Sequence, residues 1–124
     1  MTTIKSFSDL QQSKKLAEIL PIESADMWWS RCTITDFGGV LKVSYSVEPC
    51  NISQFRNTKE DIPCWSLAAL LGVLPKVINN ETLFIETSAA LWHIGYRNIY
   101  TARADNPVDA CYEMITKLHE LKML

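Results

Sequence analysis

The sequence lacks any block of like charge. Its 12 Lys and Arg residues and its 14 Asp and Glu residues are mixed along the chain and give a net charge of -2. Proteins that hold nucleic acid by its phosphate backbone carry a basic stripe or face. We therefore expect no non-specific nucleic-acid binding, although a small site with two or three basic residues is compatible with this composition.

Motifs that hold metal ions or phosphate groups are also missing. The four cysteines form no C-x-x-C pair, and the two histidines form no H-x-x-x-H or H-E-x-x-H pattern. Zinc sites take three or four ligands at such spacings. Gly38 and Gly39 stand alone and predict a turn rather than a phosphate-binding loop. We expect no metal ion and no cofactor.

Neither a membrane span nor an export signal is visible. The most apolar segment, residues 62–74, is too short for a bilayer, which needs roughly 20 residues. The first residues have no apolar core and no cleavage signal of small residues. The cysteine spacing shows no disulfide framework. These features predict a cytoplasmic protein with reduced cysteines and no membrane partner.

Three segments have helical periodicity. The first covers residues 9–20, with Ser8 as its cap and Gln11 completing a capping box. The third begins with Asn106 as its cap and Pro107 at the first helical position.

The second predicted helix, residues 62–74, carries no charge and is apolar on all sides. Asp61 is placed to cap it, with Pro63 in its first turn. A helix that is apolar all round must be covered on several sides. We therefore expect it to lie at the centre, between the other two helices.

Two pairs of strands separate the helices. Residues 27–34 and 40–47 predict one hairpin, and residues 82–87 and 91–100 predict another. Residues 48–60 predict a long loop. At 124 residues the chain predicts a single domain, residues 1–124. The order α-β-β-α-β-β-α predicts an α+β fold, with a four-stranded, mainly antiparallel sheet and three helices packed on one face.

Residues 13–29, 63–75 and 106–124 resemble a set of uncharacterised short proteins from Bacteroides-type gut bacteria, which often lie among phage-like or mobile-element genes. The resemblance covers the three predicted helices. It implies a bacterial, cytoplasmic setting. It implies no activity, cofactor or catalytic residue.

A cysteine–histidine pair is the enzyme hypothesis that the composition allows. Cys64, at the start of the second predicted helix, could be activated there and pair with His93 or His119. The alternative is that Cys64 and Cys111 are small apolar residues of the core. No catalytic spacing supports the pair, so we predict no catalytic residue.

Aromatic side chains gather on the predicted strands, and arginines lie near them in the sequence. They are either cross-strand pairs that stabilise the sheet or part of a binding surface. The apolar end of the third predicted helix is a second candidate for a binding surface. The predicted interaction surface comprises Trp28, Trp29, Tyr45, Trp92, Tyr96, Arg97, Leu121 and Met123.

The sequence favours a non-catalytic protein-interaction or accessory module with an unknown protein partner. The apolar second helix and the last residues, Leu121 to Leu124, predict an exposed apolar patch, which a homodimer would cover. A monomer is the alternative, if the flanking helices cover that patch. A small enzyme with a site of scattered Cys, His and acidic residues, or a mobile-element-associated regulator, are the alternative functions.

Overall fold

A computed structural model describes residues 5–35, 38–39, 41–45, 49–51 and 62–124. The elements follow in the order α1 (Leu10–Ile19), η1 (Ile22–Ser24, a short 3-10 helix), β1 (Met27–Trp29), β2 (Arg31–Thr35), β3 (Leu41–Tyr45), β4 (Cys50–Asn51), β5 (Ile62–Cys64), α2 (Leu67–Val73), β6 (Val77–Ile78), β7 (Glu81–Ser88), β8 (Leu91–Tyr96), β9 (Tyr100–Ala104) and α3 (Pro107–Glu120).

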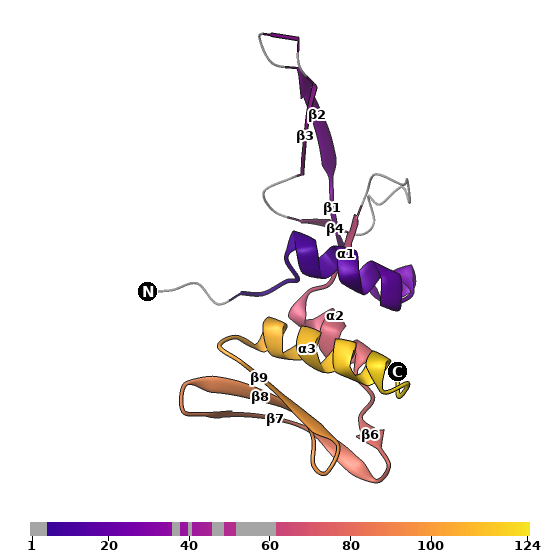
Figure 1. Ribbon diagram of the computed structural model, residues 1–124, viewed down its shortest axis with the longest axis vertical. Coiled ribbons are helices and arrows are strands. Elements are labelled where there is room, and N and C mark those ends of the chain that lie inside the picture. The colour runs from indigo at the N-terminus through magenta and orange to yellow at the C-terminus, as the bar shows by residue number, and fades with distance from the viewer. Residues whose placement is uncertain (1–4, 36–37, 40, 46–48, 52–61) are drawn as a thin grey trace.

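The C-terminal half forms a sheet covered by helices (Figure 1). Four strands pair antiparallel in the order β6-β7-β8-β9, and α3 packs against β8 and β9. The helix α2 packs on α3, and α1 contacts both α3 and β5. All three helices lie on one side of this sheet.

The N-terminal strands form two further antiparallel groups. β1 lies between β4 and β5, next to α1, while β2 and β3 form a hairpin that projects away from the helices (Figure 1). The hairpin register places Thr33 opposite Val43.

The predicted α+β class is confirmed, as are the four-stranded antiparallel sheet and the helices on one side of it. The sheet is built differently from our expectation, because β6 to β9 form it without the strands of the first hairpin. The helix that contacts both other helices and the sheet is α3, not the second helix. It supplies a continuous buried face: Val108, Ala110, Cys111, Met114, Ile115 and Leu118 are all fully buried.

The predicted helix over residues 62–74 is wrong in its first half. Ile62–Cys64 pairs with β1 as strand β5, and α2 begins only at Leu67. Ser66 caps α2, since its hydroxyl accepts from the Ala69 N–H at 3.2 Å. The predicted cap, Asp61, lies outside the described residues. A short apolar run fits a strand or a helix equally well, and here pairing with β1 decides.

The cap of α1 is displaced by one residue from the prediction. Asp9, not Ser8, is the N-cap, and Gln12 completes the capping box. Ser8 points inward instead and is fully buried. Its hydroxyl lies 2.8 Å from that of Ser13 and accepts the Trp65 N–H at 3.1 Å. Serine is a residue type that often caps helices, but Ser8 instead makes hydrogen bonds to buried polar groups of the core.

The strand predicted over residues 91–100 is broken into β8 and β9. Asn98 adopts a positive φ of 64° in the intervening turn. Gly95 pairs with Thr101, and a Cβ at Gly95 would overlap the Tyr100 carbonyl oxygen and lie 2.7 Å from the Thr101 Cα. Only glycine allows β9 to approach β8 this closely.

The loop predicted over residues 48–60 contains the short strand β4, whose Cys50 and Asn51 pair with β1. Residues 48 and 52–60 lie outside the described residues, as do residues 40, 46 and 47 of the second predicted strand.

Candidate interaction surface

An apolar pocket opens between the C-terminal end of α1, η1, α2 and the residues that follow α3. Its volume is about 530 Å³. All but one of the lining residues are apolar, and the exception is Ser24. The apolar lining residues are Ile19, Leu20, Pro21, Ala69, Gly72, Val73 and Leu124. Pockets that bind apolar ligands or partner side chains have this kind of lining.

The α1 side of the pocket is fixed by the turn after the helix. Pro21 ends α1, because a proline disfavours helical geometry in the residue before it. The Ser24 hydroxyl donates to the Pro21 carbonyl at 2.6 Å and accepts from the Trp65 indole N–H at 2.9 Å. The one polar side chain of the lining is thus already satisfied, and Trp65 anchors it from the core.

The α2 side is open because Gly72 has no side chain. A Cβ built at Gly72 would meet no other heavy atom within 4 Å. Glycine inside a helix costs roughly 0.5–1 kcal/mol relative to alanine. The chain therefore carries a destabilising residue at the position where a side chain would enter the pocket.

The third side is formed by a tight turn after α3. The Met123 N–H donates to the Leu118 carbonyl at 2.9 Å, and the Lys122 N–H donates to the His119 carbonyl at 3.1 Å. Lys122 has a φ of 59°. These two bonds and the left-handed residue define a Schellman motif, which is usually formed by glycine. The turn brings Leu124 into the pocket lining.

Three apolar side chains in this turn are exposed to solvent. The exposed fractions are 42% for Leu121, 38% for Met123 and 39% for Leu124. The turn that supplies Leu124 to the pocket lining therefore also exposes the apolar side chains of Leu121 and Met123.

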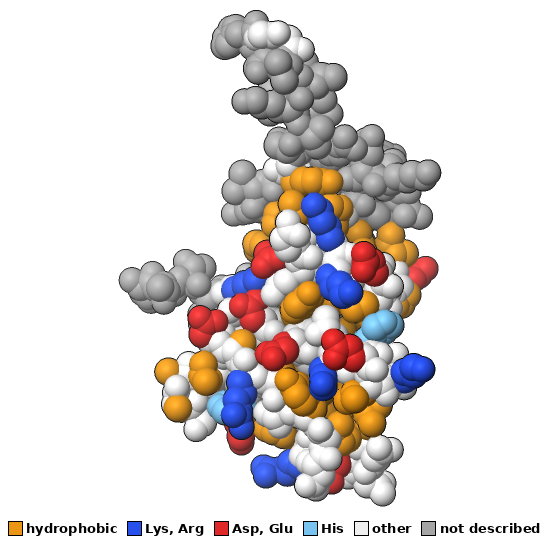
Figure 2. All heavy atoms as spheres, in the orientation of Figure 1, with side chains coloured by type: hydrophobic (Ala, Val, Ile, Leu, Met, Phe, Trp, Pro, Cys, Tyr) orange, Lys and Arg blue, Asp and Glu red, His pale blue; other side chains and the backbone are white. Residues whose placement is uncertain are grey.

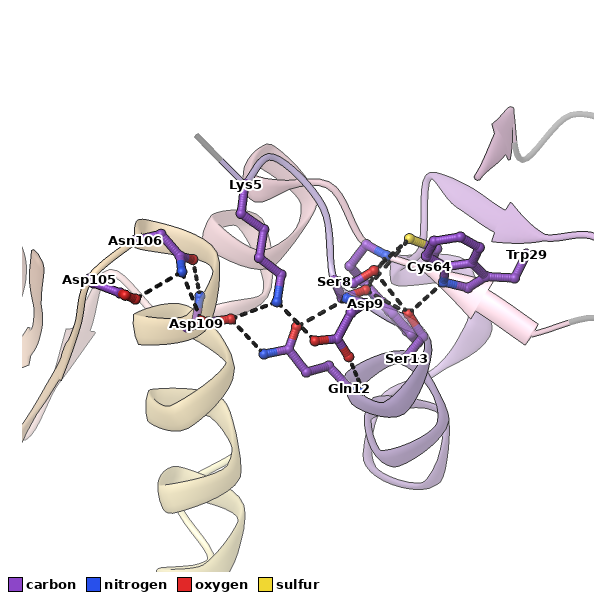
Figure 3. A network of polar contacts seen from close by, with 11 residues as sticks. Lys5, Ser8, Asp9, Gln12, Ser13, Trp29, Cys64, Asp105, Asn106 and Asp109 are labelled. Atoms are coloured by element: carbon purple, nitrogen blue, oxygen red, sulfur yellow. Dashed lines mark hydrogen bonds and ion pairs between the residues drawn. The ribbon is translucent and has the colours of Figure 1, made fainter. Parts of the chain in front are cut away.

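A polar network joins the opposite, N-terminal ends of α1 and α3 (Figure 3). Lys5 bridges Asp9 at 2.9 Å and Asp109 at 2.8 Å. Gln12 donates to Asp109 at 2.7 Å, and the Asn106 side chain donates to the same carboxylate at 2.7 Å. The network holds the two helices together where they begin, whereas the pocket lies where they end.

The charge state of this network follows from its contacts. Burial raises the pKa of Asp109, but the hydrogen bonds from Lys5, Gln12 and Asn106 and the Lys5 charge outweigh burial and lower it below its usual range. Burial lowers the pKa of Lys5, and the two carboxylates more than reverse this, so the pKa is raised. Both groups are charged at neutral pH.

The structure gives the Cys64–His93 pair no support. Cys64 lies on β5 and is fully buried, so it lacks the helix N-terminus expected to activate it. Burial raises its pKa, and its thiol lies 3.6 Å from the Ser8 hydroxyl. His93 contacts the Ser88 carbonyl at 3.3 Å. Burial also raises the pKa of Cys111, to about 12. Both cysteines are free thiols of the core.

The residues of the predicted interaction surface are scattered over the molecule. Trp28, Trp29 and Tyr96 are buried, with exposed fractions of 8%, 7% and 0%. The Trp29 indole donates to Ser13 at 3.0 Å. The Tyr96 hydroxyl donates to the Pro75 carbonyl, and burial raises the Tyr96 pKa to about 12.

The remaining five residues of that set are partly or largely exposed. Tyr45 is half-buried, with the Lys14 ammonium 5.8 Å from its ring centre. Trp92 packs against the edge of the core, and Arg97 lies over the Phe84 ring at 5.3 Å. None of the eight residues lines the pocket, although Leu121 and Met123 belong to the turn that brings Leu124 into its lining.

Sequence reasoning missed the α1 wall of the pocket, Ile19 and Leu20, and the role of Gly72. Glycine is common just after the end of a helix, yet Gly72 lies inside α2. The lack of a polar side on the second helix was the one available signal, because it left an apolar surface that two helices could not fully cover.

On the face shown in Figure 2, acidic and basic side chains are interspersed, with apolar side chains between them.

Within the described residues, no group of three or more His, Cys, Asp or Glu side chains could hold a metal ion. No helix in the same part of the chain has the length and apolarity to span a membrane.

Comparison of the chain with protein-family models, curated proteins and solved structures gave no match.

Proposed function

We propose that this protein is a non-catalytic interaction module that forms a homodimer through the pocket and the exposed turn after α3. The observation that carries the proposal is the apolar pocket of about 530 Å³, together with the exposed Leu121 and Met123 in the turn that supplies Leu124 to its lining. Exposed apolar surface of this kind usually marks an interface. The cytoplasmic, bacterial setting belongs to the same proposal and rests on the sequence alone.

The second copy is favoured as the occupant because the surface complements itself. A two-fold interface places the same patch of both subunits face to face. The patch contains both a depression, lined by Ala69, Gly72 and Val73, and projecting side chains, Leu121 and Met123. A two-fold axis near Leu124 brings the projecting side chains of each copy to the depression of the other.

An enzymatic role finds less support. The two described thiols are buried and protonated at neutral pH, because burial raises the pKa of Cys64 and Cys111. The pocket lining offers one hydroxyl, Ser24, which already makes two hydrogen bonds.

Sedimentation equilibrium of the full chain over a wide range of dilution tests the proposal. We expect a mass that rises from 14.1 kDa toward twice that value at micromolar concentration. Leu121→Glu and Met123→Glu should each weaken the dimer by about tenfold or more, because burial of such a side chain contributes roughly 1.5–3 kcal/mol. Gly72→Phe should weaken it similarly by filling the pocket. The far-UV circular dichroism of all three should match the unsubstituted protein.

Val77→Glu is the matched control. Val77 is 56% exposed on β6 and does not line the pocket, so a charge there should leave the dimer unchanged. A mass of 14.1 kDa at every concentration would refute the dimer. Dissociation by Val77→Glu but not by Leu121→Glu would refute the assigned surface.

A further inference from the structure

The outer edge of β7 carries backbone groups that pair with no other described residue along most of its length. β6 pairs only with the start of β7, placing Val77 opposite Thr82. The last bond on this side is donated by the Leu83 N–H to the Lys76 carbonyl at 2.9 Å. Beyond Leu83, the part of the chain that the structure describes pairs with β7 only through β8.

The directions of the unpaired groups follow from the ladder. In an antiparallel sheet, the N–H and C=O groups of alternate residues point to opposite edges of a strand. Leu83 points to the outer edge, so Ile85 and Thr87 do as well, while Phe84 and Glu86 face β8. Ile85 is 45% exposed, and Thr87 is also exposed. Their N–H and C=O groups can therefore receive a further strand.

Self-pairing at this edge is opposed by charge. A second copy that used both residues would place Ile85 opposite Thr87, and Glu86 directly opposite its own copy. Like charges in that position destabilise a strand pair. A register shifted toward the start of the strand would need Leu83, whose N–H is already bonded to Lys76. The edge therefore suits a strand of another protein with a cation opposite Glu86.

We propose that the edge Ile85–Thr87 binds an extended segment of a partner protein as an added antiparallel strand, with a Lys or Arg opposite Glu86. No described residue forms an ion pair with Glu86, so its charge is available to the partner. Residues of the segment on either side of the cation would lie on the same face as Ile85 and favour apolar side chains. This edge shares no residue with the pocket, so the two proposals stand or fall separately.

A short blocked peptide, acetyl-Thr-Val-Lys-Val-Thr-amide, provides the probe. It would be titrated into the 15N-labelled full chain while the amide signals of Ile85 and Thr87 are followed by NMR. We expect these two signals to shift on binding. N-methylation of both valines should weaken binding by about tenfold or more, because it removes the donors that reach the edge. Replacing the peptide lysine by glutamate should weaken it by about threefold.

Two protein variants sharpen the result. Ile85→Pro removes only the outward N–H, which an edge strand tolerates, and should weaken binding by about tenfold. Glu86→Lys should reverse the preference toward the glutamate peptide. If Ile85→Pro does not fold, the N-methylated peptide on the unsubstituted protein still decides.

Equal affinity of the methylated and unmethylated peptides would overturn the proposal. Unshifted Ile85 and Thr87 signals at millimolar peptide would overturn it as well. So would a fall in sedimentation mass caused by Ile85→Pro, because the edge would then belong to a second copy.

Discussion

The two ends of the α1–α3 pair differ in the contacts that cover them. At their N-terminal ends the helices are joined by charged hydrogen bonds among Lys5, Asp9, Gln12 and Asp109. Near their C-terminal ends, an apolar pocket lies between the end of α1, α2 and the turn after α3, and Leu121 and Leu124 in that turn are exposed. The N-terminal ends of the two helices are therefore covered by polar contacts within the chain, whereas an apolar surface stays exposed near their C-terminal ends. We call the latter the open end.

The difference shows which end of the helix pair needs no partner and which end leaves apolar surface exposed to solvent. Charged hydrogen bonds satisfy the polar ends of the helices without a partner. The open end keeps a helical glycine and solvent-exposed Leu and Met side chains, which together reduce the stability of an isolated chain. A second copy that covers the open end would recover this stability.

The largest difference is expected between two leucines, one buried and one at the open end. Leu70→Ala on α2 should destabilise the protein by about 2–5 kcal/mol, because Leu70 is fully buried. Leu121→Ala should cost at most about 1 kcal/mol in the monomer, since Leu121 is 42% exposed. Urea unfolding at concentrations below dimerisation measures both values. Similar losses would show that the open end is as tightly packed as the core.

Two glycine-to-alanine substitutions make the same comparison, and they should change the stability of the protein in opposite directions. Gly95→Ala should destabilise the protein by about 1–3 kcal/mol, because its Cβ would overlap the Tyr100 carbonyl. Gly72→Ala should stabilise the monomer by about 1 kcal/mol, because the new methyl group meets open space on a helix. Thermal unfolding of both variants distinguishes them. A destabilised Gly72→Ala monomer would mean that the pocket is narrower than described.

The smallest effect concerns the charged end and its pH dependence. The lowered pKa of Asp109 means that its contribution is present above the unfolded-state value and is lost as the pH falls through the folded-state value. Asp109→Asn should destabilise the protein by about 1 kcal/mol at neutral pH and flatten its loss of stability below about pH 4. Urea unfolding at several pH values measures both effects.

Lys15→Met is the matched control, because Lys15 pairs with Glu18 at 3.7 Å on the exposed side of α1. It should leave the acid dependence unchanged. An Asp109→Asn protein with an unchanged acid profile would contradict the role given to the network.

Local signals predicted the parts of the fold that depend on neighbouring residues. Asn106 and Pro107 mark the start of α3 without ambiguity, and the structure confirms it. The aromatic and β-branched residues of 82–87 and 91–100 likewise predicted a hairpin, although its turn residues, Ala89 and Ala90, take positive φ values of 52° and 65° that alanine disfavours.

Distant contacts decided what the sequence could not show. Ile62–Cys64 is a strand because β1 pairs with it, and Ser8 turns inward to meet Ser13 and Trp65. The pocket depends on how η1, which follows α1, packs against α2, and no local pattern encodes this contact. Leu121 and Met123 were predicted as part of an interaction surface, because apolar residues gather at the end of the third predicted helix, and both are exposed.

The central claim is that the turn after α3 of one copy occupies the pocket of another. Isotope-filtered NMR on a mixture of 13C-labelled and unlabelled chains tests it directly, by detecting contacts between copies alone. We expect intermolecular signals between the methyl groups of Leu121 or Met123 and those of Ala69 or Val73. Intermolecular signals that map only to other surfaces, or none at concentrations where the mass is that of a dimer, would contradict the claim.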